Sequence, residues 1–107
     1  ELIRRGRLYA QAGADGFFAP ALTGLEDIRE VVGAVDLPLN ILAMKAVAPI
    51  AQLKDAGVRR LSAGALIGRS AYGKAARAVK MLLDEGKYDA IFETSGDCPN
   101  FNALFGG

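Results

Sequence analysis

The chain has 107 residues, of which 51% are hydrophobic and 23% charged, and its formal net charge is +1. This length allows at most one domain and excludes a complete (β/α)8 barrel, which needs roughly 200 residues or more. Interspersed acids and bases argue against a nucleic-acid-binding surface, no apolar run is long enough to span a membrane, and the single Cys98 excludes an intrachain disulfide. We therefore expect a soluble, cytoplasmic protein that binds neither nucleic acid nor membrane, and the start at Glu1 without Met suggests a piece of a longer protein.

A unit made of a helix, a glycine and a short apolar strand occurs three times. The first unit is a helix over 1–12 with Gly13 and a strand over 15–20. The second is a helix from Thr23 to about Val32, stopped by Gly33, with a strand over 37–43, and the third is a helix over 49–56 with Gly57 and a strand over 58–63. Glycine after a helix supplies the left-handed turn that ends it, and Thr23 with Glu26 has the pattern of a capping box. The three glycines lie about 20 to 24 residues apart, the length of one helix plus one buried strand.

Strands that alternate with helices at this period are predicted to pair in parallel, because a crossover helix must carry the chain back each time. Beyond them, the apolar pattern predicts a long helix over 65–85, a short helix over 87–92 and a last apolar turn over 100–105. We therefore expect an α/β fold that forms the C-terminal portion of a TIM-type (β/α)8 barrel, with about three βα units plus terminal helices. Residues 1–107 would be one partial domain without an internal boundary.

Four residues near the carboxyl ends of the strands are candidates for substrate binding: Asn40, Ser62, Gly64 and Arg69. Asn40 is an amide within an apolar strand, so it either binds substrate or is satisfied by a neighbouring strand. Gly64 and Arg69 flank the start of the long helix, where backbone amides and a guanidinium favour an anion. The structural alternatives are a tight turn at Gly64 and an ion pair at Arg69.

The acidic residues give no sign of a metal site or of a catalytic carboxylate pair. Asp15, Asp36 and Asp55 fall on the helix-to-strand side, where the residues of barrels serve stability. We therefore expect neither a catalytic residue nor a metal ligand in this chain.

The strand regions resemble consecutive segments of one enzyme superfamily. Residues 9–20 resemble the sixth-strand segment of the isocitrate lyase/phosphoenolpyruvate mutase superfamily, residues 37–43 the seventh strand and residues 57–64 the eighth. The helix that contains Arg69 and the terminal segment Pro99–Phe105 are similar to its phosphonomutase-like members. The similarity covers essentially the whole chain in order.

The resemblance implies a Mg²⁺-dependent lyase or mutase that acts on C–C or P–C bonds of small 2-oxo or 2-hydroxy acids or phosphonates. It also implies that the Mg²⁺ ligands and the catalytic loop belong to earlier strands, so that this chain alone would be inactive. Family members exchange terminal helices, which implies a homo-oligomer. Pro20 stands where the methylisocitrate lyase branch has a substrate-contacting Glu, and this favours the phosphonomutase-like branch.

Two other hypotheses remain open at this point. The first is a catalytically inert part-barrel that acts only through subunit association, since three parallel strands leave two unpaired edges. The second is a different phosphate-binding barrel in which Ser62, Gly64 and Arg69 hold a phosphosugar.

Overall fold

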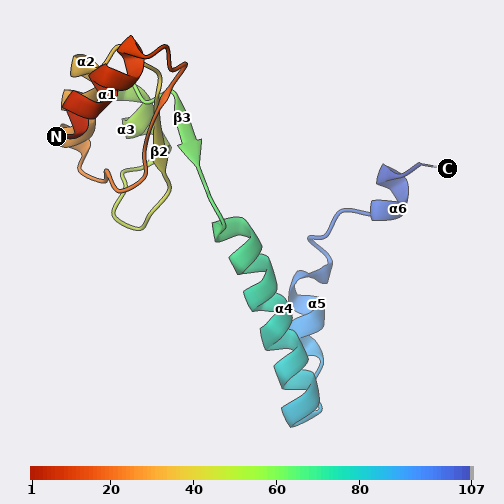
Figure 1. Ribbon diagram of the computed structural model, residues 1–107. Helices are drawn as coiled ribbons and strands as arrows, with labels where there is room; N and C mark the ends of the chain where they lie inside the picture. The colour runs from red at the N-terminus through yellow and green to blue at the C-terminus, as the bar shows by residue number, and fades with distance from the viewer. Residues whose placement is uncertain (107) are drawn as a thin grey trace. The chain divides into compact units, whose positions relative to one another are not determined.

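The computed structural model of the protein describes residues 1–106, apart from the side chain of Thr94. The chain forms two compact units, Glu1–Gly64 and Ala65–Gly107 (Figure 1). The expectation that residues 1–107 form one partial domain without an internal boundary stays a prediction.

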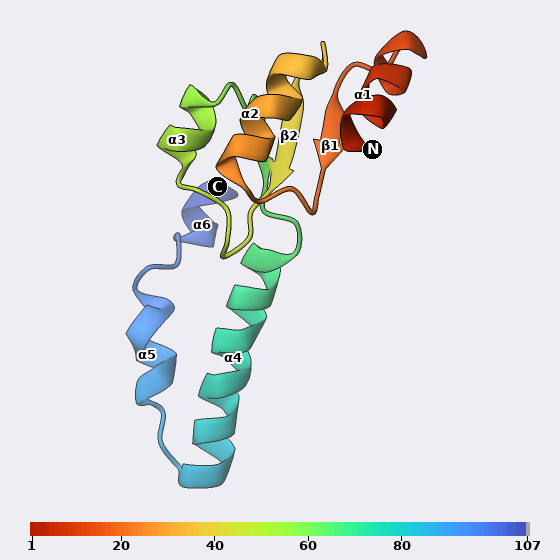
Figure 2. The ribbon, with the colours of Figure 1, turned by 90° about the vertical axis from the view of Figure 1, so that its left-hand side faces the viewer.

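The first unit alternates helices and strands. Its elements are α1 (Leu2–Gln11), β1 (Phe17–Ala19), α2 (Leu25–Ala34), β2 (Leu39–Leu42), α3 (Ile50–Asp55) and β3 (Arg60–Ser62). The strands form one three-stranded sheet in the order β1-β2-β3, and both pairings are parallel. Figure 2 shows β1 and β2 side by side with α1, α2 and α3 around them. The predicted α/β class and the parallel pairing are confirmed.

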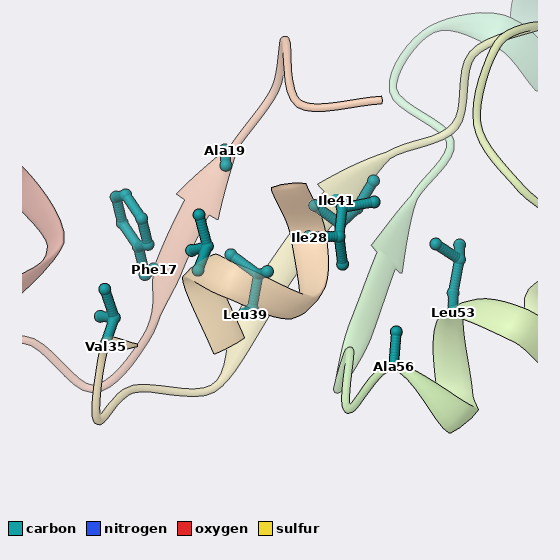
Figure 3. Packing of buried hydrophobic residues seen from close by; sticks show 9 residues of the cluster. Phe17, Ala19, Ile28, Val35, Leu39, Ile41, Leu53 and Ala56 are labelled. Atoms are coloured by element: carbon teal, nitrogen blue, oxygen red, sulfur yellow. The ribbon is translucent and has the colours of Figure 1, made fainter. Parts of the chain in front are cut away.

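One face of this sheet holds the hydrophobic core. Side chains alternate along a strand, so Phe17 and Ala19 of β1 share a face with Leu39 and Ile41 of β2. These residues are buried in one cluster with five others: Ile28, Val31, Val35, Leu53 and Ala56 (Figure 3). Apolar residues of α1 pack against the same cluster. All three helices of the first unit therefore cover the same face of the sheet.

The opposite face of the sheet is free of these helices. It is formed by Phe18, Asn40, Leu42, Arg60 and Ser62, which alternate with the core residues along the strands. We call these five residues the helix-free face. A sheet whose strand order follows the chain, with all helices on one face, is wound in a single direction. Doubly wound sheets instead reverse their strand order and carry helices on both faces.

The end of α2 differs from the sequence-based expectation. Gly33 does not stop the helix, which continues through it to Ala34. The chain leaves the helix at Val35, whose backbone is extended (φ −123°, ψ 118°) and whose side chain is buried in the core. The carbonyl of Ala34 accepts a hydrogen bond from Nε of Arg7 in α1 at 2.9 Å. An arginine from another helix thus satisfies a carbonyl that the helix end leaves without a partner.

The capping box predicted at the start of α2 is also wrong. The N-cap residue is Gly24 rather than Thr23, and no side chain caps the helix. The Glu26 carboxylate instead pairs with Arg29, one helical turn further on. Glu26 and Asp27 lie in the first turn of α2, where their negative charges interact favourably with the positive end of the helix dipole.

The left-handed turns predicted at Gly13 and Gly57 are confirmed, with φ of 88° and 90°. These two glycines make a matched pair of sites. A Cβ at Gly57 would lie 2.7 Å from Cγ1 of Val32, whereas a Cβ at Gly13 would meet nothing within 4 Å. We expect Gly13→Ala to lower the free energy of unfolding by about 1 kcal/mol through backbone strain alone. Gly57→Ala should lower it by about 2 to 3 kcal/mol, because the steric overlap adds to the same strain. Urea unfolding of the two variants checks this, and equal losses would contradict it.

The second unit is helical. It contains α4 (Leu66–Glu85), α5 (Asp89–Ser95) and α6 (Phe101–Leu104). Gly86 (φ 65°) ends α4. Helix α5 packs along α4 (Figure 2), and Arg77 of α4 forms an ion pair of 2.5 Å with Glu93 of α5. The long helix thus matches its predicted range closely, and α5 lies somewhat later than expected. No residue of α4 is buried, and its apolar side chains Leu66, Val79 and Leu82 stay largely exposed although α5 packs along this helix. No helix among residues 1–106 combines the length and apolar composition needed to cross a membrane.

Candidate functional site

The helix-free face brings together two of the four predicted site residues, Asn40 and Ser62. Nδ2 of Asn40 donates to Oγ of Ser62 at 2.9 Å, and this Oγ lies 3.1 Å from Oδ1 of Asn40, to which it can donate in turn. Asn40 is only 9% exposed, so the pair satisfies an amide that would be costly to bury alone. A side-chain amide has two N–H donors, and one of them remains beyond this pair.

The strand register explains why these residues meet. Asn40 lies opposite Arg60 across the β2–β3 ladder, and Leu42 lies opposite Ser62. The amide of Ala43 donates to the carbonyl of Ser62 at 2.8 Å, so the pairing continues to the carboxyl end of β2. Ser62 therefore sits at the carboxyl edge of the sheet and Asn40 one layer deeper. This edge is the one that carries function in parallel α/β proteins.

Gly64 forms the tight turn after β3. Its φ is 56°, in the left-handed region, and a Cβ there would lie 3.3 Å from Cδ1 of Leu42. Backbone geometry thus accounts for glycine at this position. A role of Gly64 in ligand binding stays a prediction.

Arg69 belongs to the first turns of α4, in the second unit. Its side chain is exposed, and no carboxylate partner is found for it within the described part of the chain. The ion pair that the sequence left open as its structural role is therefore not formed among these residues. The predicted grouping of Arg69 with Asn40 and Ser62 stays a prediction.

Arg60 is not among the four predicted site residues, although the register places it directly beside Asn40. The sequence could have indicated it, because side chains alternate along the strand Arg60-Leu61-Ser62 and so place Arg60 on the same face as Ser62. Arg60 adds a guanidinium to the face that holds the amide and the hydroxyl.

Across residues 1–106, no group of three or more His, Cys, Asp or Glu side chains lies close enough to hold a metal ion. Asp15 and Asp36 precede β1 and β2, at the end of the sheet opposite to Ser62. The donors of the helix-free face are instead an amide, a hydroxyl and a guanidinium, which suit an anion.

The Asn40–Ser62 pair allows a double-mutant test. Ser62→Ala should lower the free energy of unfolding by about 1 to 3 kcal/mol, because a buried amide loses its partner. Asn40→Leu combined with Ser62→Ala should cost less than this single change, since both polar groups are then gone. Ser70→Ala, at an exposed position of α4, serves as the control. Urea unfolding measures these variants together with Asn40→Leu alone, and strictly additive losses of the two single changes would show that the pair is not coupled.

The fold and this face define a class: a singly wound parallel α/β segment with polar side chains at the carboxyl edge of its sheet. The family model for phosphoenolpyruvate phosphomutase matches residues 1–83. The chain therefore belongs to the phosphoenolpyruvate phosphomutase family, and the resemblance to the isocitrate lyase/phosphoenolpyruvate mutase superfamily is confirmed.

The chain is also similar to individual proteins. Uncharacterized proteins from two strains of Mycobacterium tuberculosis, CDC 1551 and H37Rv, are each 36% identical over 80 residues, which cover 72% of this chain and 31% of theirs. The crystal structure of a putative lyase/mutase from Burkholderia cenocepacia J2315 is 28% identical, with a TM-score of 0.85, over 99% of this chain and 39% of that one. A putative phosphonomutase from the same organism is 36% identical, with a TM-score of 0.69, over 75% and 33%. The chain thus spans about a third of the length of its curated relatives.

Proposed function

We propose that this chain is the C-terminal part of a (β/α)8 barrel enzyme, a cytoplasmic lyase or mutase. The complete enzyme would act on C–C or P–C bonds of small 2-oxo or 2-hydroxy acids or of phosphonates. The observation that carries the proposal is the family match over residues 1–83, joined to a sheet that is wound in one direction.

The geometry of the sheet supports the barrel. Within the first unit, β1 and β3 each pair only with β2, so both outer edges can accept a further strand. Unpaired edges are normally covered or blocked in a finished fold. Five further strands would close the sheet, with α1 to α3 outside and the helix-free face inside.

In this proposal Asn40 and Ser62 bind substrate from inside the barrel, at its carboxyl end. The spare N–H of the amide donates to a carboxylate or phosphonate oxygen, and the hydroxyl of Ser62, which still accepts from Nδ2 of Asn40, turns its single O–H from Oδ1 of Asn40 to the substrate. Gly64 lets the backbone turn close to this edge, and Arg69 adds positive charge at the start of α4.

Mg²⁺ is part of the proposal as a cofactor of the complete enzyme, where it would act as a Lewis acid. Its ligands would lie outside residues 1–106, which hold no suitable cluster of acids. What this chain contributes is substrate binding and orientation.

A second candidate function is subunit association without catalysis. The observation that favours it is the set of large apolar side chains left exposed in the second unit, among them Ile67, Tyr72, Leu83 and Phe105. Exposed apolar patches commonly mark interfaces. In the enzyme hypothesis the same residues would serve a homo-oligomer, so association alone does not separate the two.

A chimaera separates them. The chain replaces the matching 39% of the Burkholderia lyase/mutase, and the product is assayed with Mg²⁺ against a panel of 2-oxo acids, 2-hydroxy acids and phosphonates. We expect a folded barrel that converts at least one compound that the unmodified Burkholderia protein also converts. A chimaera that folds but leaves every such compound intact would overturn the enzymatic proposal and favour association.

A further inference from the structure

Arg60 and Asn40 are paired across the β2–β3 ladder, and Ser62 follows Arg60 by two residues on the same face. Asn40 and Ser62 are already joined by hydrogen bonds of 2.9 and 3.1 Å. The register therefore places an arginine beside the asparagine and the serine on one face of the sheet. All three side chains are hydrogen-bond donors.

The charge of Arg60 has no counterpart on this face. The other four residues of the helix-free face are Phe18, Asn40, Leu42 and Ser62, none of them acidic. Four other arginines pair with carboxylates: Arg4 and Arg5 with Glu1, Arg29 with Glu26 and Arg77 with Glu93. Among the described residues, Arg59 and Arg69 have no carboxylate partner either, but neither of them lies on the helix-free face. For Arg60, no such partner occurs in the portion of the chain that the structure describes.

The barrel proposed above, on which this inference rests, turns the helix-free face into an interior surface. A guanidinium taken out of water needs an anion at close range, because an unpaired buried charge is strongly unfavourable. The planar fork of arginine matches a carboxylate in a bidentate manner. The neighbouring amide and hydroxyl can donate to the same oxygens.

We propose that Arg60 is a further substrate-binding residue, which together with Asn40 and Ser62 binds a carboxylate group of the substrate. Small 2-oxo and 2-hydroxy acids all carry such a group. Arg60 fixes the position of that carboxylate, and it takes no part in bond cleavage.

Arg59 provides a matched control. It has the same charge and is exposed, and it is the residue next to Arg60, so alternation directs it to the opposite side of the sheet. Arg59→Gln and Arg60→Gln therefore change the net charge equally, but only the second alters the helix-free face. Arg60→Lys keeps the charge and removes the fork.

The first experiment titrates the 107-residue chain with oxalate while NMR follows the side-chain amide of Asn40 and the backbone amide of Ser62. We expect saturable shifts, with binding weakened roughly tenfold in Arg60→Gln, by less in Arg60→Lys, and unchanged in Arg59→Gln. Because Arg60 is exposed in the first unit, the variants should keep the wild-type spectrum. Absent shifts, or equal weakening by Arg59→Gln, would overturn the proposal.

In the complete barrel, the anion beside Arg60 could come from the substrate or from a carboxylate side chain of the rest of the barrel. The second experiment separates these two sources by placing Arg60→Gln in the chimaera. If substrate is the partner, KM rises roughly tenfold while the melting temperature stays unchanged. A lower melting temperature with unchanged KM would overturn the proposal. A failure of the proposed function gives a different result from a failure of this inference. In that case the chimaera with Arg60 intact is inactive, although the chain still binds oxalate.

Discussion

Ile41→Ala is expected to remove most of the stability of the first unit. Ile41 lies in the central strand, is fully buried, and belongs to the cluster that joins the sheet to its helices. Replacing a buried isoleucine by alanine costs about 2 to 5 kcal/mol, since transfer energy is lost and a cavity remains. A unit of this size, Glu1–Gly64, is stabilised by roughly 3 to 10 kcal/mol in total. Hydrogen exchange of the β2 amides measures the loss directly.

The control for this change is Ile50→Ala, which removes the same atoms from a side chain that is 69% exposed. We expect it to alter the free energy of unfolding by no more than about 0.5 kcal/mol. Similar losses at positions 41 and 50 would mean that the sheet is not packed as described.

Gly6→Ala should destabilise the protein although it improves the helix propensity of α1. Gly6 is buried, and a Cβ there would lie 2.8 Å and 3.0 Å from the two γ carbons of Val35. Valine is stiff at χ1 and cannot easily turn away. Overpacking costs about 1 to 3 kcal/mol, and with two close γ carbons we expect the upper part of this range, which exceeds the roughly 1 kcal/mol that alanine gains over glycine in a helix. Thermal unfolding of the variant tests this balance.

Gly73→Ala isolates the propensity term. Gly73 lies within α4, and a Cβ there meets nothing within 4 Å. We expect this variant to be more stable by about 0.5 to 1 kcal/mol, opposite in sign to Gly6→Ala. Adding Val35→Ala to Gly6→Ala should make the effect of the glycine change smaller, because the clash is relieved. Two stabilising glycine variants would show that α1 does not approach Val35 this closely.

Much of the fold could be predicted because its signals are local. Gly13 and Gly57 end their helices in the left-handed conformation, and a short apolar run follows each of them, so the order of helices and strands was correct. The prediction that α2 ends at Gly33 was wrong, because the end of this helix depends on Val35, whose side chain lies close to distant residues such as Gly6. Sequence spacing carries no information about such tertiary contacts.

The candidate site was predictable only in part for a similar reason. An amide within an apolar strand marks Asn40 as unusual without naming its partner. Ser62 is that partner because the β2–β3 register places Ser62 opposite Leu42, the residue that follows Asn40 on the same face of β2. The same register brings in Arg60, which resembles an ordinary surface arginine in the sequence. Arg69 lies in the other unit, so its part in the site stays a prediction.

The strand order has a consequence for how the protein is made. The two ladders of the described sheet each join a strand to the one synthesised about 20 residues before it, so neither of these pairings waits for a distant part of the polypeptide. As the nascent chain leaves the ribosome, β1 emerges first and can receive β2, and β2 can then receive β3. Only helices follow β3 in the described chain, so in the proposed barrel the free edge of β3 would close on a strand that was synthesised earlier.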